Sequence, residues 1–172
     1  MSRSNPMVAI YPGSFEPVTV GHEDIARRAL RFADHVVVAV ARAATQAKRA
    51  FFTLEERLEM LEEVFGDDEG IECATFDGLL VDFAREREIR FVIRGLRAVS
   101  DFEYEFQMAQ MNRELYDEFE TIFLVPDADS SFLSASLVRE VATLGGDVSR
   151  FVSPPVLRRF REKLPTTPER NR

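Results

Sequence analysis

The sequence contains no tryptophan and only one cysteine, Cys73, among its 172 residues. A single cysteine excludes an intrachain disulfide and a cysteine metal cluster. The chain also lacks an apolar run that approaches the roughly 18 residues of a membrane-spanning helix. Its polar start, residues 1–6, is too short for a signal peptide. These absences predict a cytoplasmic protein with no membrane partner.

Lysine is nearly absent as well, since Lys48 and Lys163 are the only two in the chain. Arginine therefore supplies most of the 22 basic side chains, while 30 acidic residues bring the formal net charge to −8. An acidic surface repels the backbone of nucleic acids, so we expect no nucleic-acid partner. Any phosphate-bearing ligand would have to be held by a local basic site.

The chain is rich in apolar sequence, with 45% hydrophobic residues and 15 phenylalanines, a composition typical of a globular domain. Segments rich in β-branched residues alternate with amphipathic segments, and this alternation predicts an α/β fold. We expect a doubly wound, Rossmann-like, five-stranded parallel sheet with helices on both faces. The predicted domain covers residues 1–164, followed by a polar tail at 165–172 that we expect to be disordered. Predicted strands are 7–11, 36–41, 71–76, 91–93 and 121–125, and predicted helices are 24–32, 53–65, 79–87, 101–115, 136–144 and 154–163.

In open parallel sheets, ligands bind beyond the carboxyl ends of the strands. After the first strand, Gly13 permits close backbone approach, Ser14 offers a hydroxyl, and Gly21-His22 opens the next helix. A helix N-terminus suits phosphate, and a bound triphosphate would favour the charged form of His22. The alternative is a plain structural turn. The sequence has neither a Gly-x-Gly-x-x-Gly fingerprint nor a Gly-x-x-x-x-Gly-Lys-Ser/Thr loop.

Two further segments bring cations to the predicted strand ends. Lys48-Arg49 follows the second strand, where a compact ammonium can follow a moving phosphate; the alternative is a solvated basic loop. Arg94 and Arg97 flank Gly95 after the fourth strand, and arginine can bind phosphate oxygens with two parallel hydrogen bonds. The alternative for these arginines is ordinary ion pairing with the acidic residues that follow, namely Asp101, Glu103 and Glu105.

The last part of the chain adds two features. Four serines follow the fifth strand, and one of them is expected to cap the next helix, while a serine-rich helix start also suits an anion. Phe102, Phe106 and Met111 fall roughly on one face of the helix predicted at 101–115, which indicates a core or subunit contact. The four serines are Ser130, Ser131, Ser134 and Ser136.

Together these motifs resemble the phosphopantetheine adenylyltransferase family, within the nucleotidyltransferase superfamily that carries a Thr/His-x-Gly-His motif. That motif is present as Thr19-Val-Gly-His22 and is specific only to the superfamily. The stretch from Arg94 to Glu105, with Arg-Gly-Leu-Arg-Ala followed by Asp-Phe-Glu-Tyr-Glu, is specific to the family. The matching stretches are residues 9–22, 52–57, 93–105 and 131–138, and they come in family order.

The resemblance implies a single nucleotidyltransferase domain that moves AMP from ATP to 4′-phosphopantetheine, giving dephospho-coenzyme A and pyrophosphate. It implies catalytic roles for His22, Lys48 and Arg94, with Arg49 as the alternative to Lys48. Residues implied in binding the acceptor are Ser14, Lys48, Leu80 and Arg94. Residues implied in binding ATP are Ser14, Phe15, His22, Gly95, Leu96, Arg97, Glu105, Ser130, Ser131, Phe132, Leu133, Ser134, Ala135 and Ser136.

The resemblance also implies Mg²⁺ carried on the ATP phosphates without a protein metal site, a homohexamer, and coenzyme A as a candidate feedback ligand. The acceptor is a phosphate monoester that is mostly dianionic at neutral pH and needs no general base. We therefore expect His22 to act as a hydrogen-bond donor and not as a nucleophile. Two alternatives remain: a related enzyme with another acceptor, such as nicotinate mononucleotide, and a non-catalytic ATP-binding module.

Overall fold

The computed structural model describes residues 6–42, 50–97 and 99–164 of the chain. Five parallel strands form one sheet in the order β3-β2-β1-β4-β5, so the first strand of the chain lies at its centre. The chain builds the β2-β3 side first and then crosses to the β4-β5 side, which makes the β1–β4 junction the topological switch point. The strands are β1 (Val8–Gly13), β2 (His35–Ala41), β3 (Ile71–Phe76), β4 (Phe91–Gly95) and β5 (Glu120–Leu124).

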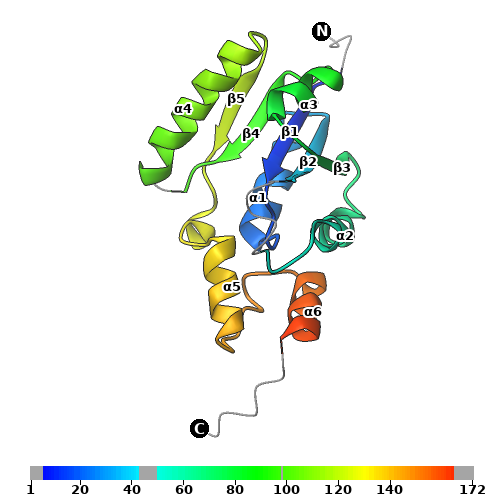
Figure 1. The fold of residues 1–172 in the computed structure, drawn as a ribbon, viewed down its shortest axis with the longest axis vertical. Helices are drawn as coiled ribbons and strands as arrows, with labels where there is room; N and C mark the ends of the chain where they lie inside the picture. The colour runs from blue at the N-terminus through cyan, green and yellow to red at the C-terminus, as the bar shows by residue number, and fades with distance from the viewer. Residues whose placement is uncertain (1–5, 43–49, 98, 165–172) are drawn as a thin grey trace, which may run out of the picture.

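Helices connect the strands and continue beyond the last one. Figure 1 shows α5 and α6 on the side of the sheet toward which β1 and β4 run. Among the described residues, no helix is long and apolar enough to cross a membrane. The helices are α1 (Val20–Ala29), α2 (Leu54–Phe65), α3 (Leu80–Glu86), α4 (Val99–Leu115), α5 (Ala135–Thr143) and α6 (Pro154–Lys163), with a short 3-10 helix η1 (Ala128–Ser130) before α5.

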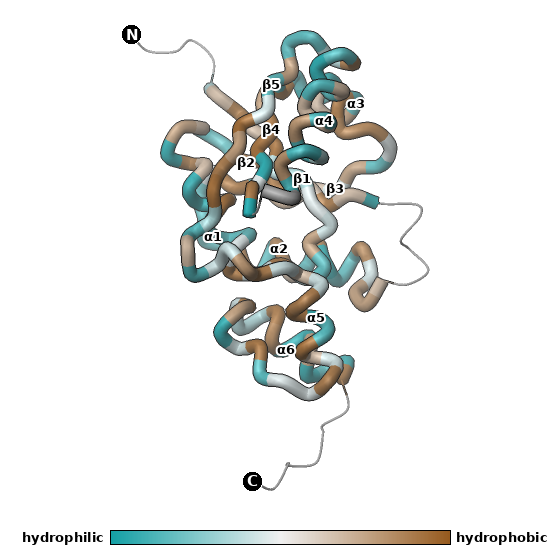
Figure 2. Tube along the Cα trace, turned by 90° about the vertical axis from the view of Figure 1, so that its left-hand side faces the viewer, coloured by the Kyte–Doolittle hydropathy of each residue, from teal (hydrophilic) through white to brown (hydrophobic). Residues whose placement is uncertain are grey.

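The sheet is buried on both faces, which explains why β2 is a continuous apolar run. Val36, Val38 and Val40 pack on one face with buried residues of α1, α2, α5 and α6. Val37 and Ala39 pack on the other face with α3 and with the segment that precedes β5. Successive side chains of a strand point to opposite faces, so each face receives its own core. Hydrophobic stretches run through the sheet in Figure 2, and the predicted doubly wound α/β fold is confirmed.

Two predicted boundaries next to the first loop are wrong. β1 does not end at residue 11 but continues through Pro12 and Gly13, which lie opposite Ala39 and Val40 of β2. A proline is tolerated there because β4 pairs with β1 only at its earlier residues, so this part of β1 has a neighbour on one side.

Helix α1 begins at Val20, four residues before the predicted start at residue 24. Thr19 caps it, and His22 closes a capping box in place of the usual Glu or Gln. Because the sequence has no Glu or Gln at this position, the start of the helix was predicted four residues too far along the chain. The predicted tail at 165–172 lies outside the described residues, and the assignment of residues 1–164 to one domain stays a prediction.

Candidate active site

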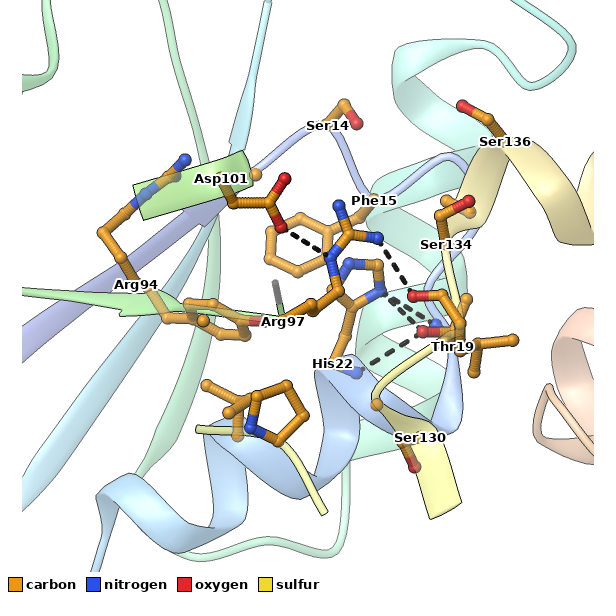
Figure 3. A pocket seen from close by; sticks show the side chains of 18 of the residues that line it. Ser14, Phe15, Thr19, His22, Arg94, Arg97, Asp101, Ser130, Ser134 and Ser136 are labelled. Carbon is orange, nitrogen blue, oxygen red and sulfur yellow. Dashed lines mark hydrogen bonds and ion pairs between the residues drawn. The ribbon is translucent and has the colours of Figure 1, made fainter. Parts of the chain in front are cut away.

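A cavity of about 500 Å³ opens beyond the carboxyl ends of β1 and β4, between the N-termini of α1 and α5. Figure 3 shows His22, Arg97 and Ser134 around this cavity, with Arg94 at its opposite side. The switch point of the sheet is where a ligand is expected in this fold. Twelve predicted site residues line the cavity, namely Ser14, Phe15, His22, Arg94, Gly95, Arg97, Glu105, Ser130, Leu133, Ser134, Ala135 and Ser136.

Other predicted residues do not line this cavity. Leu80 packs against the core on the α3 face, and the amide of Leu96 donates to the carbonyl of Leu124 at 2.9 Å. Ser131 closes η1, and the Phe132 ring meets Phe151 edge-on. Their assigned contacts with substrate stay predictions. Lys48 and Arg49 lie outside the described residues.

His22 is held by the N-terminal cap of α1. The Thr19 amide donates to His22 Nδ1 at 3.1 Å, and the Thr19 hydroxyl lies 3.1 Å from the same nitrogen. Because a backbone N–H can only donate, Nδ1 carries no proton, and the neutral ring has its hydrogen on Nε2. Loss of hydration and the positive charge of Arg97 lower the pKa of His22 to about 4. At neutral pH His22 is therefore a neutral donor, and the expected imidazolium in the presence of a triphosphate stays a prediction.

The loop between β1 and α1 packs under this histidine. Phe15 adopts a left-handed backbone conformation with φ of 43°, and its ring meets the imidazole edge-on at 5.2 Å. A Cβ on Gly13 would lie 3.1 Å from the Phe15 ring, so glycine lets this ring approach the backbone without being displaced. Arg57 of α2 donates to the carbonyl of Ser14 at 2.9 Å. These contacts fix the Ser14 segment at the edge of the cavity.

Arg94 makes a two-pronged ion pair with Glu105 of α4. Its Nε lies 2.7 Å from Oε2 and its Nη2 lies 2.5 Å from Oε1, while Nη1 donates to the carbonyl of Pro12 at 3.2 Å. Burial of the guanidinium is the largest single influence and acts against its charge, but the hydrogen bonds and the negative charge of Glu105, with smaller contributions from two tyrosines, together raise the pKa of Arg94. Three of five N–H groups are used, which leaves two for a ligand.

Arg97 connects β4 to the start of α5. It donates to the carbonyl of Leu133 at 3.0 Å, and its Nε lies 3.5 Å from Asp101. The Ser134 hydroxyl accepts from the amide of Leu137 and so caps α5. By helix geometry the N–H groups of the first residues, Ala135 among them, have no partner within the helix, so they offer an anion site at the cavity.

Sequence reasoning missed Arg139, which lines the cavity from α5. Its Nη1 donates to the carbonyl of Glu16 and lies 3.7 Å from the Glu16 carboxylate, and its Nη2 lies 3.4 Å from the Ser136 hydroxyl. The buried Glu16 carboxylate also accepts from the amides of Phe51 and Phe52. The available signal was the i, i+3 spacing from Ser136, which places Arg139 on the same helix face.

The structure shows ion pairs of the two arginines, and their binding of phosphate stays a prediction. Arg94 and Arg97 pair with Glu105 and Asp101, as the alternative predicted, yet all four side chains line the cavity. Their positive charges are partly neutralised in the ligand-free chain. Among the described residues, no group of three or more His, Cys, Asp or Glu side chains is placed to hold a metal ion.

A match to a protein-family model gives the class of protein. The cytidylyltransferase-like family model matches residues 10–141, which include β1, β4 and the cavity between them. The fold and this match define a nucleotidyltransferase. The chain belongs, more narrowly, to the phosphopantetheine adenylyltransferase family, as its motifs indicated.

Named relatives support this family assignment. The phosphopantetheine adenylyltransferase of Methylobacillus flagellatus is 56% identical over 155 residues, which cover 90% of this chain and 96% of the relative. That of Alkalilimnicola ehrlichii is 55% identical over 152 residues, covering 88% and 87%. That of Azoarcus sp. is 55% identical over 157 residues, covering 91% and 95%.

Solved structures support the fold at much lower sequence identity. A nicotinic acid mononucleotide adenylyltransferase from Plasmodium falciparum, complexed with NaAD, superposes with a TM-score of 0.66 at 14% identity. A putative nicotinate-nucleotide adenylyltransferase from Vibrio parahaemolyticus gives the same TM-score at 15% identity. Each likeness covers 95% of this chain and 100% of the other. At this identity the likeness establishes the shared architecture alone.

The pKa of His22 leads to a prediction about stability at low pH. Above the unfolded-state pKa of 6.5 the imidazole is neutral in both states. As the pH falls from 6.5 toward about 4, the unfolded chain binds the proton first, so the free energy of unfolding falls. His22→Asn keeps an acceptor for the Thr19 amide but cannot titrate. Urea unfolding should show that, between about pH 7.5 and about pH 4.5, the free energy of unfolding of the wild type falls by on the order of 2 kcal/mol more than that of the variant.

NMR spectroscopy measures the protonation of His22 independently of stability. Nitrogen-15 imidazole spectra contain signals from His22 and His35 only, because the chain has two histidines. The His22 signals should keep the pattern of a neutral ring protonated at Nε2 well below pH 6.5. Titration of His22 near its unfolded-state pKa would contradict the prediction. So would an equal change in the free energy of unfolding with pH for wild type and His22→Asn.

The Arg94–Glu105 pair leads to a second prediction. Glu105→Gln keeps one hydrogen-bond acceptor but leaves the half-buried Arg94 without its counter-charge. We expect the free energy of unfolding to fall by about 1–3 kcal/mol, the range for a hydrogen bond to a charged group. Glu103→Gln, at an exposed position on the same helix, is the matched control and should change little. Equal stability of the two variants by urea unfolding would show that the ion pair does not support this site.

Proposed function

We propose that this chain catalyses the transfer of AMP from ATP to 4′-phosphopantetheine, giving dephospho-coenzyme A and pyrophosphate in the cytoplasm. The observation that carries the proposal is the shared cavity of His22 and Arg94, at the carboxyl ends of neighbouring strands. The names of relatives 52–56% identical over about nine-tenths of this chain support the same reaction.

The reaction calls for charge control more than for acid or base catalysis. The acceptor phosphate is mostly dianionic at neutral pH because its second pKa is about 6. One of its oxygens forms a bond to the α-phosphorus of ATP, and the bond from that phosphorus to the bridging oxygen of the β-phosphate breaks. Pyrophosphate leaves with the electron pair. The protein has to bring two anions together in line and stabilise the charge that develops.

We assign the acceptor phosphate to Arg94, whose two remaining N–H groups match phosphate oxygens. Lys48, or Arg49 beside it, is proposed as the second cation on that phosphate. Ser14 is proposed to contact both substrates from the end of β1. Leu80 is proposed to contact the pantetheine arm, although it lies outside the cavity lining described above.

We assign the ATP phosphates to the opposite side of the cavity. The Nε2–H of His22, Arg97 and the N-terminus of α5 are proposed to stabilise negative charge on the α-phosphate and on the leaving pyrophosphate. Mg²⁺ would enter as part of the nucleotide, as is usual for an ion that prefers phosphate oxygens and water. Further proposed ATP contacts are Phe15, Gly95, Leu96, Glu105 and residues 130–136.

Two rival functions predict different products. An enzyme with another acceptor would turn over nicotinate mononucleotide, and a non-catalytic module would bind ATP without turnover. The position of Arg94 argues against the second rival, because it lies across the cavity from the α5 N-terminus and offers a separate cation for a second phosphate.

The test uses purified protein with MgATP and either 4′-phosphopantetheine or nicotinate mononucleotide. We expect dephospho-coenzyme A and pyrophosphate from the first acceptor and no adduct from the second, measured by mass spectrometry. His22→Asn keeps the cap acceptor but loses the Nε2–H donor. It should lower kcat by about 10²–10³, as does removal of one oxyanion donor, with little change in the KM for ATP. Product from nicotinate mononucleotide alone, or ATP binding with no product, would overturn the proposal.

We further propose that the chain assembles as a homohexamer and that α4 supplies a contact surface. Phe102, Phe106 and Met111 are 49%, 48% and 57% exposed on this helix, which is unusual for large apolar side chains. The two phenylalanine rings stack on one another at 5.8 Å and form one patch. Exposed apolar patches commonly mark protein interfaces. A second copy of this chain is the occupant that the family resemblance implies.

Light scattering tests the assembly. The wild-type mass should be six times that of the 19.6-kDa chain. Phe106→Glu should yield smaller particles, because it places a charge in the apolar patch. Leu144→Glu, at an exposed apolar residue after α5, is the matched control and should keep the wild-type mass. A monomeric wild type, or an unchanged Phe106→Glu, would count against this surface.

A further inference from the structure

Tyr11 is a buried residue with a polar hydroxyl that lines the cavity, and the proposed mechanism does not use it. It belongs to the central strand β1, is 5% exposed and lines the cavity. Its ring meets Phe15 edge-on at 5.5 Å and lies 6.5 Å from the ring of His22. An aromatic ring fits this packing, but the packing gives no reason for a hydroxyl on it.

The direction of the Tyr11 hydroxyl follows from two observations. Across the part of the chain that the structure describes, this hydroxyl makes no hydrogen bond. Yet no fully buried side-chain nitrogen or oxygen of the described residues lacks a hydrogen-bond partner. On these two observations we place the Tyr11 oxygen in the small part of the residue that remains exposed, at the cavity that Tyr11 lines. The hydroxyl of a buried tyrosine usually has a hydrogen-bond partner, so the Tyr11 hydroxyl is available to a ligand.

The electrostatic surroundings favour an anionic ligand atom at this oxygen. The charges of Arg94 and Arg97 both act on the phenol, so the hydroxyl lies within the field of both arginines. Burial outweighs them and raises the pKa of Tyr11, so the phenol stays protonated at neutral pH. The side chain can then donate a hydrogen bond.

We propose that the Tyr11 hydroxyl donates a hydrogen bond to a phosphate oxygen of ATP, or of the pyrophosphate that leaves it, in the space between Arg94 and Arg97. This inference rests on the proposed adenylyl transfer and adds a substrate contact to it. The hydroxyl is a neutral donor between two cations, so it contributes direction without adding repulsion to the site. The alternative is that Tyr11 is a structural core residue whose hydroxyl is hydrogen-bonded only to water.

A spectroscopic test is practical because the chain has three tyrosines and no tryptophan. Tyrosine labelled with carbon-13 at Cζ gives three signals, and Tyr104→Phe and Tyr116→Phe identify two of them, which leaves the signal of Tyr11. We expect the Tyr11 signal to shift saturably with MgATP and with inorganic pyrophosphate. The signal of Tyr116, which stacks on Phe119 outside this cavity, should stay unchanged. An unmoved Tyr11 signal with bound ligand would overturn the proposal, whether or not Tyr11→Phe folds.

Kinetics of Tyr11→Phe give the second measurement. The substitution keeps the ring contacts and removes one oxygen, and kcat/KM should fall by about tenfold to hundredfold, the range for a hydrogen bond to a charged group. Tyr116→Phe is the matched control and should stay within about twofold of wild type. A Tyr11→Phe enzyme as active as that control would refute the contact. If pyrophosphate shifts the Tyr11 signal while wild type makes no dephospho-coenzyme A, the proposed function fails and the donor role stands.

Discussion

Like charges are brought together in this cavity because each is held by a carboxylate. Arg94 and Glu105 form the strongest of these pairs, with two parallel hydrogen bonds. Arg97 and Arg139 make looser single contacts, 3.5 Å from Asp101 and 3.7 Å from the Glu16 carboxylate. Three unpaired guanidinium groups at one cavity would repel one another and would orient poorly. Paired, they are fixed in place before a ligand arrives, and part of their hydrogen-bonding capacity remains free.

At the start of α1, one set of contacts both stabilises the helix and fixes the hydrogen-bond donor of His22. Thr19 and His22 complete the capping box that begins the helix. The amide of Thr19 occupies Nδ1, and this leaves Nε2 to carry the hydrogen. Packing of Phe15 against the imidazole holds the ring in place, and Gly13 leaves room for the Phe15 ring. The tautomer of a proposed catalytic residue is thus a consequence of helix capping.

The geometry separates two places with hydrogen-bond donors within one cavity. The N-terminus of α5 and His22 face one side, and Arg94 lies at the other (Figure 3). A protein that only binds ATP has no use for the second place, whereas a transferase must hold a donor and an acceptor. Tyr11 lines this cavity and is influenced by the charges of both Arg94 and Arg97.

The sequence by itself determined the α/β class, the parallel sheet and the family. Hydrophobic periodicity and the motifs around His22 and Arg94 are local properties of the chain, and they survive in any correct fold. It also placed the site at strand ends, because parallel topology leaves the carboxyl edge as the common meeting point.

Only the tertiary structure decided which charges meet. Arg139 joins the cavity because α5 packs beside the β1–α1 loop, 123 residues away along the chain from Glu16. The pairing of Arg94 with Glu105 and the protonation pattern of His22 depend on distances of about 3 Å. The availability of the Tyr11 hydroxyl likewise depends on the residues that pack around β1. Such properties arise from packing between distant segments, and a linear pattern carries no record of them.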